Sequence, residues 1–272
     1  MALTPFQREV CRLLAQNRIA IGESYVAGGA ALNAILAQPR LSRDIDVFHD
    51  SREAVANAWN ADRETLLSAG FRVQVLTERP TYVEAVVERE GDRLLMQWVE
   101  DSAYRYFPLV EHPDFGLALH PFDLATNKVL ALVGRLEVRD WVDVMGCSAS
   151  LQPLGYLMWA ASGKDPGLSP EHILSEAARS SRYTQEEVAT LDFEGPAPDA
   201  GSLSRAWHSI LEEAKAIVAL LPGEHAGAAV LDISFNLLRA RSAELRQLLD
   251  SGRVQFHEPV LRGAFPTVRE AP

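Results

Sequence analysis

The sequence has little cysteine and no long hydrophobic run. Only Cys11 and Cys147 occur among its 272 residues, and both lie in apolar segments with helical spacing. We therefore expect two core thiols in a reducing compartment, not a disulfide or a nucleophile. No stretch of about eighteen apolar residues is present, so no membrane-spanning helix is expected. The N-terminus lacks a basic segment followed by an apolar core, which argues against a signal peptide and predicts a cytoplasmic protein without a membrane partner.

Positive charge and clustered histidines are also scarce. The net charge of −11 opposes a large nonspecific nucleic-acid surface, because such binding depends on attraction to phosphate. The seven histidines are scattered and show no zinc spacing. His49 and His120 lie nearest the motifs described below, and we expect both to be structural. The hydrophobic content of 47% is ample for buried cores, and the length allows two compact units.

A pair of glycines followed by two alternating carboxylates is the most informative pattern. A short strand runs into Gly28 and Gly29, a helix-forming segment follows, and the next strand carries Asp44 and Asp46. Side chains two apart in a strand point the same way, so both carboxylates share a face. Glycine lets the backbone approach a phosphate, and the helix N-terminus offers N–H groups to it. Because Mg²⁺ is usually held by one or two carboxylates plus phosphate oxygens, the pattern predicts a metal-triphosphate site.

A second group of polar residues lies further along the chain. Residues 121–135 have apolar residues at helical spacing, with Lys128 beside the stripe. The segment from Arg139 to Asp143 follows, and in a helix Asp140 and Asp143 share a face. Solvated surface lysine and a structural ion-pair network are the alternative interpretations.

The first motif resembles a known superfamily. Residues 26–48 look like the first motif of the DNA polymerase beta-like nucleotidyltransferases, in which a Gly-Gly or Gly-Ser turn and a helix precede a strand with Asp-x-Asp. The segments Gly28–Leu32 and Leu41–Asp46 resemble the AbiEii-type toxin branch, which includes the MenT toxins. The resemblance extends to the lysine helix and the Arg-Asp-x-x-Asp segment. It implies an enzyme that moves NMP from an NTP to a hydroxyl acceptor.

The same resemblance implies an acceptor, a protein partner, a metal cofactor and roles for individual residues. A tRNA 3′ end would be the acceptor, and a bacterial cell would encode a cognate antitoxin. Mg²⁺, with Mn²⁺ as an alternative, would be the cofactor, and two ions would be bound. Asp140 or Asp143 would complete the site or orient the lysine. Catalytic residues would be Asp44, Asp46, Lys128, Asp140 and Asp143; metal ligands would be Asp44 and Asp46; nucleotide-binding residues would be Gly28, Gly29, Arg43, Lys128 and Arg139. Arg43 and Arg139, together with Arg40 and Arg135, are candidates because they lie beside the motifs, where they could receive a triphosphate or an RNA 3′ end, and a surface arginine is the alternative for each.

The third acidic residue of the superfamily has no clear counterpart. In the strand predicted over 93–99, Gln97 stands where that residue is expected, and an amide is a weaker metal ligand than a carboxylate. Three readings remain open. Asp101 supplies the carboxylate, the site works with two carboxylates plus Asp140 and Asp143, or the site is impaired and the protein only binds nucleotide. A small-molecule acceptor, as for aminoglycoside-modifying relatives, is a further alternative.

The order of the predicted elements indicates an α+β protein. A helix over 51–69 precedes strands over 71–76, 82–88 and 93–99, the last two joined by a hairpin turn. This predicts a polymerase beta-like mixed sheet with helices in residues 1–120 and a mainly helical domain in residues 121–272, which completes the active site. Near the end of the chain we expect a helix over 203–221, a strand over 229–233, a helix over 237–249 and a strand over 253–256.

Overall fold

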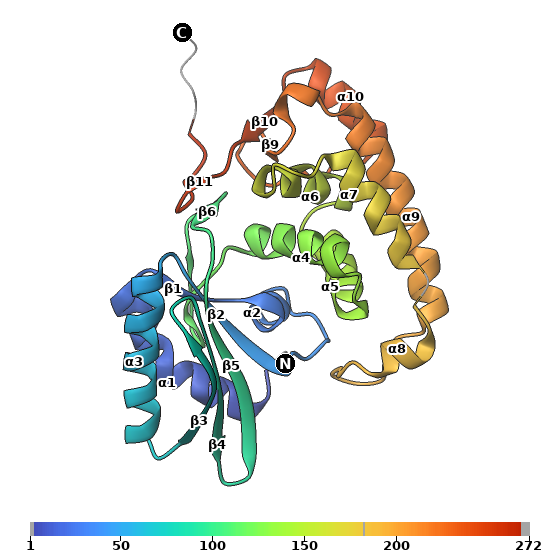
Figure 1. Ribbon diagram of the computed structural model, residues 1–272. Helices are drawn as coiled ribbons and strands as arrows, with labels where there is room; N and C mark the ends of the chain where they lie inside the picture. Colours follow the sequence, from blue (N-terminus) through green and yellow to red (C-terminus); the bar gives the residue numbers. More distant parts are fainter. Residues whose placement is uncertain (1–2, 182, 268–272) are drawn as a thin grey trace. The chain divides into compact units, whose positions relative to one another are not determined.

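The computed structural model describes residues 3–181 and 183–267 and groups the chain into two compact units (Figure 1). The first unit contains Met1–Ala103, Leu109–His120 and Asp192–Gly195. The second contains Tyr104–Pro108, Pro121–Leu191 and Pro196–Pro272. The predicted division near residue 120 therefore has two exceptions. Residues 104–108 belong to the second unit and residues 192–195 to the first, and local sequence patterns do not indicate either.

Seven strands of the first unit form one mixed sheet within the described chain, in the order β3-β4-β5-β2-β1-β8-β7. β2 is antiparallel to β1 and parallel to β5, and β4 is antiparallel to both its neighbours. The strands are β1 (Ser24–Ala27), β2 (Asp44–His49), β3 (Arg72–Arg79), β4 (Tyr82–Arg89), β5 (Asp92–Glu100), β7 (Val110–His112) and β8 (Gly116–Ala118). The α+β fold class and its mixed sheet are confirmed.

Three helices flank this sheet. Figure 1 shows α1 (Pro5–Ile21) and α3 (Arg52–Ser68) on one side of it and α2 (Gly28–Ile35) on the other. Thr4 caps α1 reciprocally with Gln7, because each side chain bonds the other's backbone N–H. Ser51 caps α3 by accepting a bond from the N–H of Ala54. The helix predicted over 51–69 is thus confirmed, with Ser51 as its cap.

A buried polar network lies on the α1 and α3 side of the sheet. Arg18 and Asp62 form an ion pair that is almost inaccessible to solvent, and Trp98 Nε1 donates to Asp62 at 2.7 Å. Arg18 Nη1 also donates to Ser24 Oγ at 3.2 Å, and Ser24 Oγ lies 3.1 Å from His49 Nε2. The network ties two helices to β1, β2 and β5, so His49 is structural, as expected.

The second unit is mainly helical, as predicted. Its short strands are β6 (Tyr104–Arg105) paired with β11 (Val260–Leu261), and β9 (Ala229–Asp232) paired with β10 (Val254–His257). Its α-helices are α4 (Pro121–Arg135), α5 (Val138–Ser150), α6 (Leu154–Ala161), α7 (Pro170–Ala177), α8 (Gln185–Ala189), α9 (Ala200–Leu220) and α10 (Ser242–Asp250), and its 3₁₀ helices are η1 (Ser162–Lys164), η2 (Ala178–Ser181) and η3 (Gly223–His225).

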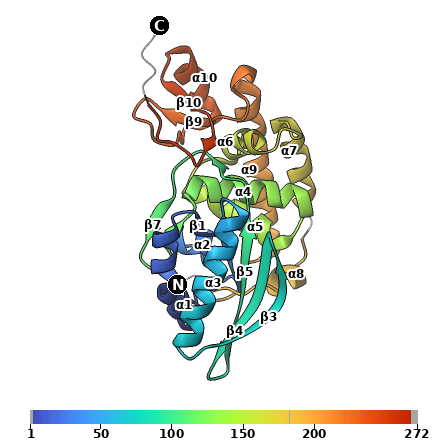
Figure 2. The same cartoon turned by 60° about the vertical axis from the view of Figure 1, so that its left-hand side comes forward.

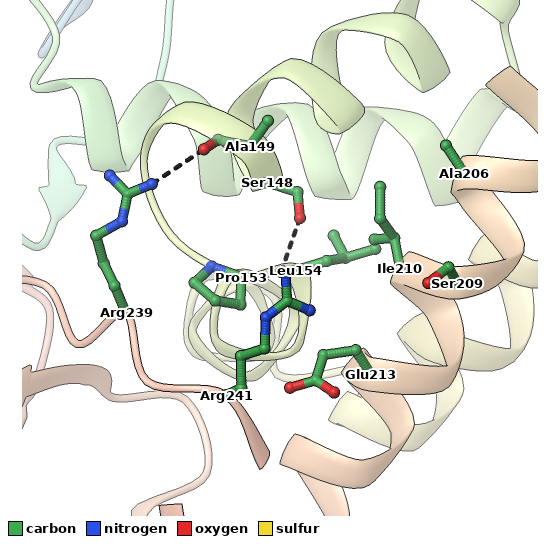
Figure 3. Close-up of a pocket in the computed structure, with 10 residues that line it drawn as sticks. All are labelled: Ser148, Ala149, Pro153, Leu154, Ala206, Ser209, Ile210, Glu213, Arg239 and Arg241. Carbon is green, nitrogen blue, oxygen red and sulfur yellow. Dashed lines mark hydrogen bonds between the residues drawn. The ribbon is translucent and has the colours of Figure 1, made fainter. Parts of the chain in front are cut away.

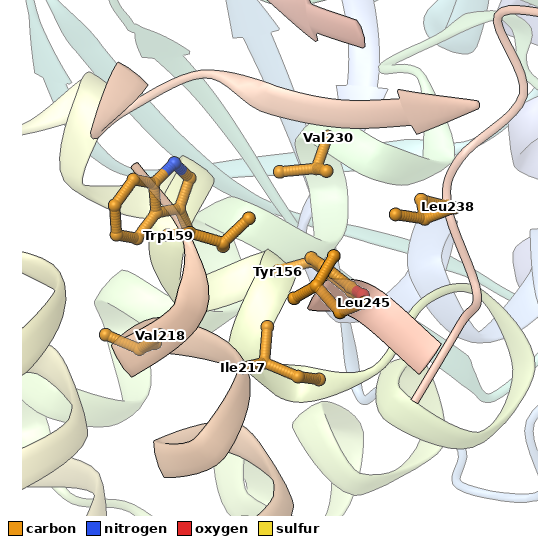
Figure 4. Packing of buried hydrophobic residues seen from close by; sticks show 8 residues of the cluster. Tyr156, Trp159, Ile217, Val218, Val230, Leu238 and Leu245 are labelled. Carbon is orange, nitrogen blue, oxygen red and sulfur yellow. The ribbon is translucent and has the colours of Figure 1, made fainter. Parts of the chain in front are cut away.

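The end of the second unit packs around one apolar cluster. Tyr156 and Trp159 of α6, Ile217 and Val218 of α9, and Val230 of β9 meet there (Figure 4). Figure 2 shows the β9–β10 pair beside α10. The stripe predicted on the long helix is therefore core, and Cys147, like Cys11 in the first unit, is a buried free thiol. In the described part of the chain, no helix is both long and apolar enough to span a bilayer.

One helix prediction is wrong at its start. The helix expected from Leu237 begins only at Ser242. Leu237 pairs with Leu231 in a β-bridge, and the N–H of Leu238 donates to the carbonyl of Val230 at 3.0 Å. The backbone of this segment thus pairs with β9. This pairing prevents a helix there, although the apolar residues of the segment have helical spacing.

Candidate active site

The turn between β1 and α2 places Gly28 against Asp46. Gly28 has a φ of +66°, which L side chains rarely adopt. A Cβ at this position would lie 1.9 Å from Asp46 Oδ2 and 2.9 Å from its Cγ. The register of β1 with β2, in which Ala27 pairs with Asp46, produces this approach. Position 28 must therefore be glycine for both backbone and contact reasons.

The two carboxylates of β2 share a face, as predicted. Asp44 and Asp46 are partly exposed, whereas Ile45 and Val47 between and after them are fully buried. Ser42 Oγ donates to Asp44 Oδ1 at 2.8 Å. Side-chain alternation in a strand explains the arrangement, with apolar residues toward the core and carboxylates toward the opposite face.

The donors that β2 offers to a cation are few but hard. Among residues 3–181 and 183–267, no group of three or more His, Cys, Asp or Glu side chains is arranged to hold a metal ion. Magnesium accepts one or two protein carboxylates when phosphate oxygens and waters complete its shell. The oxygens of Asp44 and Asp46 therefore fit a cation that arrives with a triphosphate better than a resident structural metal.

Arg40 and Gly29 lie together at the start of α2. A Cβ at Gly29 would be 2.5 Å from Arg40 Nη2 and 3.2 Å from Ser42 Oγ, so glycine leaves room for both groups. Arg40 is 5% exposed, and Ala27, which precedes the helix, provides no side-chain cap. Helix N–H groups and a guanidinium at one place suit an anion. Sequence reasoning ranked Arg40 no higher than other nearby arginines, because its burial depends on tertiary contacts.

Arg43 is in a different situation. Its side chain is 73% exposed and its Nε lies 2.5 Å from Asp192 Oδ2. The ion pair joins the segment before β2 to the segment 192–195. A nucleotide-binding role for Arg43 stays a prediction, and Arg40 is the arginine that the fold places beside the glycine turn.

Register identifies a neighbour of Asp46 that local sequence could not. Gln97 of β5 pairs directly with Asp46, and Glu84 of β4 pairs with Gln97 on the far side. Gln97 Nε2 donates to Glu84 Oε1 at 3.2 Å. Glu84 is thus the nearest carboxylate in this row of the sheet, and it was missed because strand pairing must be known to see it.

Asp101 does not occupy the position of the third carboxylate. Its N–H donates to the carbonyl of His49 at 2.9 Å, which continues the β2–β5 ladder beyond the end of β5. Asp101 is four residues beyond Gln97, which corresponds to about 13 Å along a strand. The strand register thus places Asp101 away from Asp46, and the alternative in which Asp101 supplies the third carboxylate gains no support from the pairing.

A second cluster lies within the second unit, where α4 packs against α5. Lys128 Nζ is 3.0 Å from Asp140 Oδ1 and 3.2 Å from Asp143 Oδ2. Arg135 binds Asp140 through Nε at 2.6 Å and Nη2 at 2.9 Å. Lys128 is 7% exposed, and both carboxylates are buried. The buried position of Lys128 contradicts its interpretation as a solvated surface lysine. The geometry fits both remaining interpretations, that Asp140 or Asp143 orients the lysine and that the group is a structural ion-pair network, so the catalytic roles stay predictions.

The charges in this cluster control the protonation of Asp140. Burial by itself would raise the pKa of this carboxyl, but the hydrogen bonds and positive charges of Arg135 and Lys128 outweigh it and lower the pKa below its ordinary value. Asp140 is therefore ionised at neutral pH. Arg139 turns instead to Glu137, with 2.6 Å between Nε and Oε2. Its role in nucleotide binding stays a prediction.

The second unit also contains a cavity of about 400 Å³ between α5, α6 and α9 (Figure 3). Arg239 donates to the carbonyls of Ala149 and Ser150 at the end of α5, and the N–H of Leu154 donates to Ser148 Oγ. None of the predicted site residues lines this cavity. Two of the side chains that line it, Arg239 and Ser148, bind backbone groups at helix ends.

Comparisons with known proteins do not identify a family for this chain. No family model and no curated protein matches the sequence. Among solved structures, the chain resembles a protein described as "putative nucleotidyltransferase from H. pylori", at 15% sequence identity and a TM-score of 0.46, over 77% of this chain and 98% of that one. This likeness assigns neither a family nor an activity to the chain.

Proposed function

We propose that the chain is a metal-dependent nucleotidyltransferase, which moves an NMP group from an NTP onto a hydroxyl acceptor and releases pyrophosphate. The contact between the Gly28 backbone and the Asp46 carboxylate is the observation that best supports this function. It brings hard oxygen donors next to the N–H groups at the start of a helix, and these are the groups that a metal-bound triphosphate needs.

Asp44 and Asp46 are the residues that would hold Mg²⁺, or Mn²⁺ with the same oxygen donors. Gly28 fits this role, because any Cβ there would fill the space beside Asp46 Oδ2. When bound, the divalent ion neutralises triphosphate charge and lowers the pKa of the attacking hydroxyl. The two carboxylates lie on one strand, so the backbone of β2 sets their separation.

Other residues of the chain would bind and orient the nucleotide. The N–H groups of Gly28 and Gly29 and the guanidinium of Arg40 would contact phosphate oxygens. Lys128 would contact the triphosphate and offset charge on the leaving pyrophosphate, with Asp140 and Asp143 fixing the position of its ammonium group.

Pyrophosphate release from each NTP in the presence of Mg²⁺ and total bacterial RNA tests this function. We expect turnover with the wild type and a loss of roughly 1,000-fold in Asp46→Asn, because one of two metal ligands is removed. Asp92→Asn, at the exposed turn between β4 and β5, is the matched control and should keep wild-type turnover. Turnover that survives Asp46→Asn would exclude the proposed site.

For the acceptor we propose a tRNA 3′ end and for the biological role the toxin of a toxin–antitoxin pair, on the resemblance of the Gly-Gly and Asp-x-Asp segments. Inducible expression in bacteria should arrest growth, and the arrest should disappear with Asp46→Asn. Mass analysis of tRNA 3′ ends should then find added nucleotides only with the wild type. Growth arrest that persists in the variant would contradict the mechanism.

Two features favour other outcomes of the same experiments. Net charge of −11 favours a neutral or cationic small acceptor over RNA, and label recovered outside the RNA would identify that case. Gln97 beside Asp46 favours a protein that binds nucleotide without catalysis. Calorimetry that detects Mg²⁺-dependent NTP binding while pyrophosphate release is absent would identify that case.

A further inference from the structure

A row of polar side chains crosses four strands of the sheet, starting at Asp46. Asp46 of β2 pairs with Gln97 of β5, Gln97 pairs with Glu84 of β4, and Glu84 pairs with Thr77 of β3. Paired residues in a ladder point to the same face, so the four side chains follow one another on the face that carries the carboxylates of β2. Strand spacing puts the Cα atoms of Asp46 and Glu84 about 10 Å apart.

The neighbouring rows on this face are mainly apolar. On one side, Phe48 and Val99 pair in the ladder, and Val99 pairs with Tyr82. On the other side, Leu95 pairs with Val86 and also with Asp44, the other proposed metal ligand. Glu84 is therefore flanked along β4 by Tyr82 and Val86, and it lies in line with a proposed metal ligand, from which one amide separates it.

The Glu84 carboxylate interacts with two neighbours. Gln97 Nε2 donates to its Oε1 at 3.2 Å. Tyr82 lies two residues before Glu84 on the same strand, and the pKa of Tyr82 is raised, first by burial and then by its interaction with Glu84 and the charge of Asp46. The charge of Asp46 thus acts on the same small region as Glu84. The hydrogen bond from Gln97 restricts the orientation of a side chain that otherwise has three rotatable bonds.

From this geometry we infer that Glu84 is a catalytic residue that takes the proton of the attacking hydroxyl, and that Gln97 is its positioning residue. The inference rests on the proposed nucleotidyl transfer. The acceptor oxygen forms a bond to the α-phosphorus, and the bond from that phosphorus to the bridging oxygen breaks. Pyrophosphate leaves with the electron pair, and the hydroxyl proton moves to the Glu84 carboxylate.

The other groups of this row are less suited to the role. The amide of Gln97 has no basic oxygen of comparable strength, and its N–H₂ already donates to Glu84. The oxygens of Asp46 are needed by the metal. Gln97 lies between the two strand positions, which are about 10 Å apart, so Glu84 is not a ligand of the same ion as Asp46 and its carboxylate stays available for a proton.

The test compares Glu84→Gln with Glu88→Gln. Glu88 lies on the same face of β4, where it pairs with Arg72 and Arg93, so the control removes the same charge from the same strand. We expect Glu84→Gln to lower kcat at least 100-fold, while the Kd of Mg²⁺-NTP, measured by calorimetry, changes less than twofold. Glu88→Gln should change neither quantity. Gln97→Ala should lower kcat about tenfold without changing the KM for NTP.

The outcomes separate the possible roles of Glu84. Unchanged kcat in Glu84→Gln would overturn the inference, and a large rise in the Kd of Mg²⁺-NTP would overturn it in favour of a metal ligand. Wild-type protein that binds but does not turn over any NTP would remove the proposed function and this inference with it. If Glu84→Gln is unfolded by circular dichroism, Glu84→Asp replaces it, with the same expected loss of kcat because the carboxylate is withdrawn by one methylene.

Discussion

Gly28 shows how much one missing side chain contributes to the site. Two glycines of the first unit have nearly the same backbone, since Gly22 at the end of α1 has a φ of +70° and Gly28 a φ of +66°. Their surroundings differ, because a Cβ at Gly22 would meet no atom within 4 Å, whereas one at Gly28 would overlap Asp46. Backbone strain and contact with Asp46 can therefore be measured separately.

We expect Gly22→Ala to lower the free energy of unfolding by about 1 kcal/mol, the cost of a left-handed alanine. Gly28→Ala should lower it by about 3 kcal/mol, because overlap adds the cost of displacing Asp46. Urea denaturation of the two variants and the wild type measures both values. Equal costs would show that Asp46 moves aside without penalty and that the contact is not restrictive.

Lys128, Arg135, Asp140 and Asp143 form a charge cluster. Removing one charged member leaves an opposite charge buried with one partner fewer. Lys128→Met should destabilise the protein by about 3 kcal/mol, because the buried carboxylate of Asp143 then loses a cation that lies 3.2 Å away. Adding Asp143→Asn should restore at least about 1 kcal/mol, which a double-mutant cycle in urea would detect. Lys215→Met, at an exposed position of α9, is the control and should cost less than about 0.5 kcal/mol. An additive cycle would contradict the coupling.

At the scale of elements, the polar network behind β1 and β2 makes the first unit sensitive to acid. Burial, together with the positive charge of Arg18, lowers the pKa of His49 to about 4, from an ordinary value of 6.5. Between these values the unfolded chain binds the proton and the folded chain does not. Stability is therefore complete above pH 6.5 and is lost as the pH falls toward 4.

The corresponding prediction concerns unfolding free energies at pH 7 and pH 5. The wild type should lose about 2 kcal/mol over this interval through His49. His49→Asn keeps a polar side chain at the position but cannot take up the proton, so its loss should be smaller by that amount. Urea denaturation at both pH values measures the difference. An identical pH dependence in the two proteins would mean that His49 is protonated in the folded state.

Elements with strong local signals were predicted well. The alternation of the strand that begins at Asp44, the helix over 51–69 and the hairpin between β4 and β5 all follow from short-range patterns, and the structure confirms them. The start of α10 was not predictable, because its preceding residues pair with β9. Glu84 was hidden for the same reason. Alternation shows which face a residue takes, but only strand order shows that Glu84 lies next to Gln97 and Asp101 does not lie next to Asp46.

Local spacing was also informative for the lysine cluster. An interval of three residues predicted that Asp140 and Asp143 share a face, and both bind Lys128. Burial was harder to predict. Arg40 and Arg43 are separated by only two residues and look alike in sequence, yet one is 5% exposed beside Gly29 and the side chain of the other is 73% exposed beside Asp192. Long-range packing decides this difference, and one sequence carries no direct signal of it.

At the scale of the whole molecule, the two units are interleaved along the chain. The carbonyl of Asp192 accepts the N–H of Leu41 at 2.8 Å, and the N–H of Glu194 donates to the carbonyl of Pro39 at 2.7 Å. Residues 192–195 therefore complete the segment that carries Arg40, although most of their sequence neighbours belong to the second unit. A division of the chain near residue 120 would remove these bonds from the first unit.

This pairing also sets an order of events on the ribosome. Asp192, which pairs with Arg43, lies 149 residues downstream of it. The ribosome therefore adds Asp192 and Glu194, whose backbones bond Leu41 and Pro39, long after it has made β2. N-terminal regions begin to fold during synthesis, but the segment around Arg40 cannot reach its final state until residues 192–194 have emerged. A chain whose translation stops early would thus carry both aspartates of β2 without the finished segment around Arg40, and the newly made protein would complete the proposed nucleotide site late in its own production.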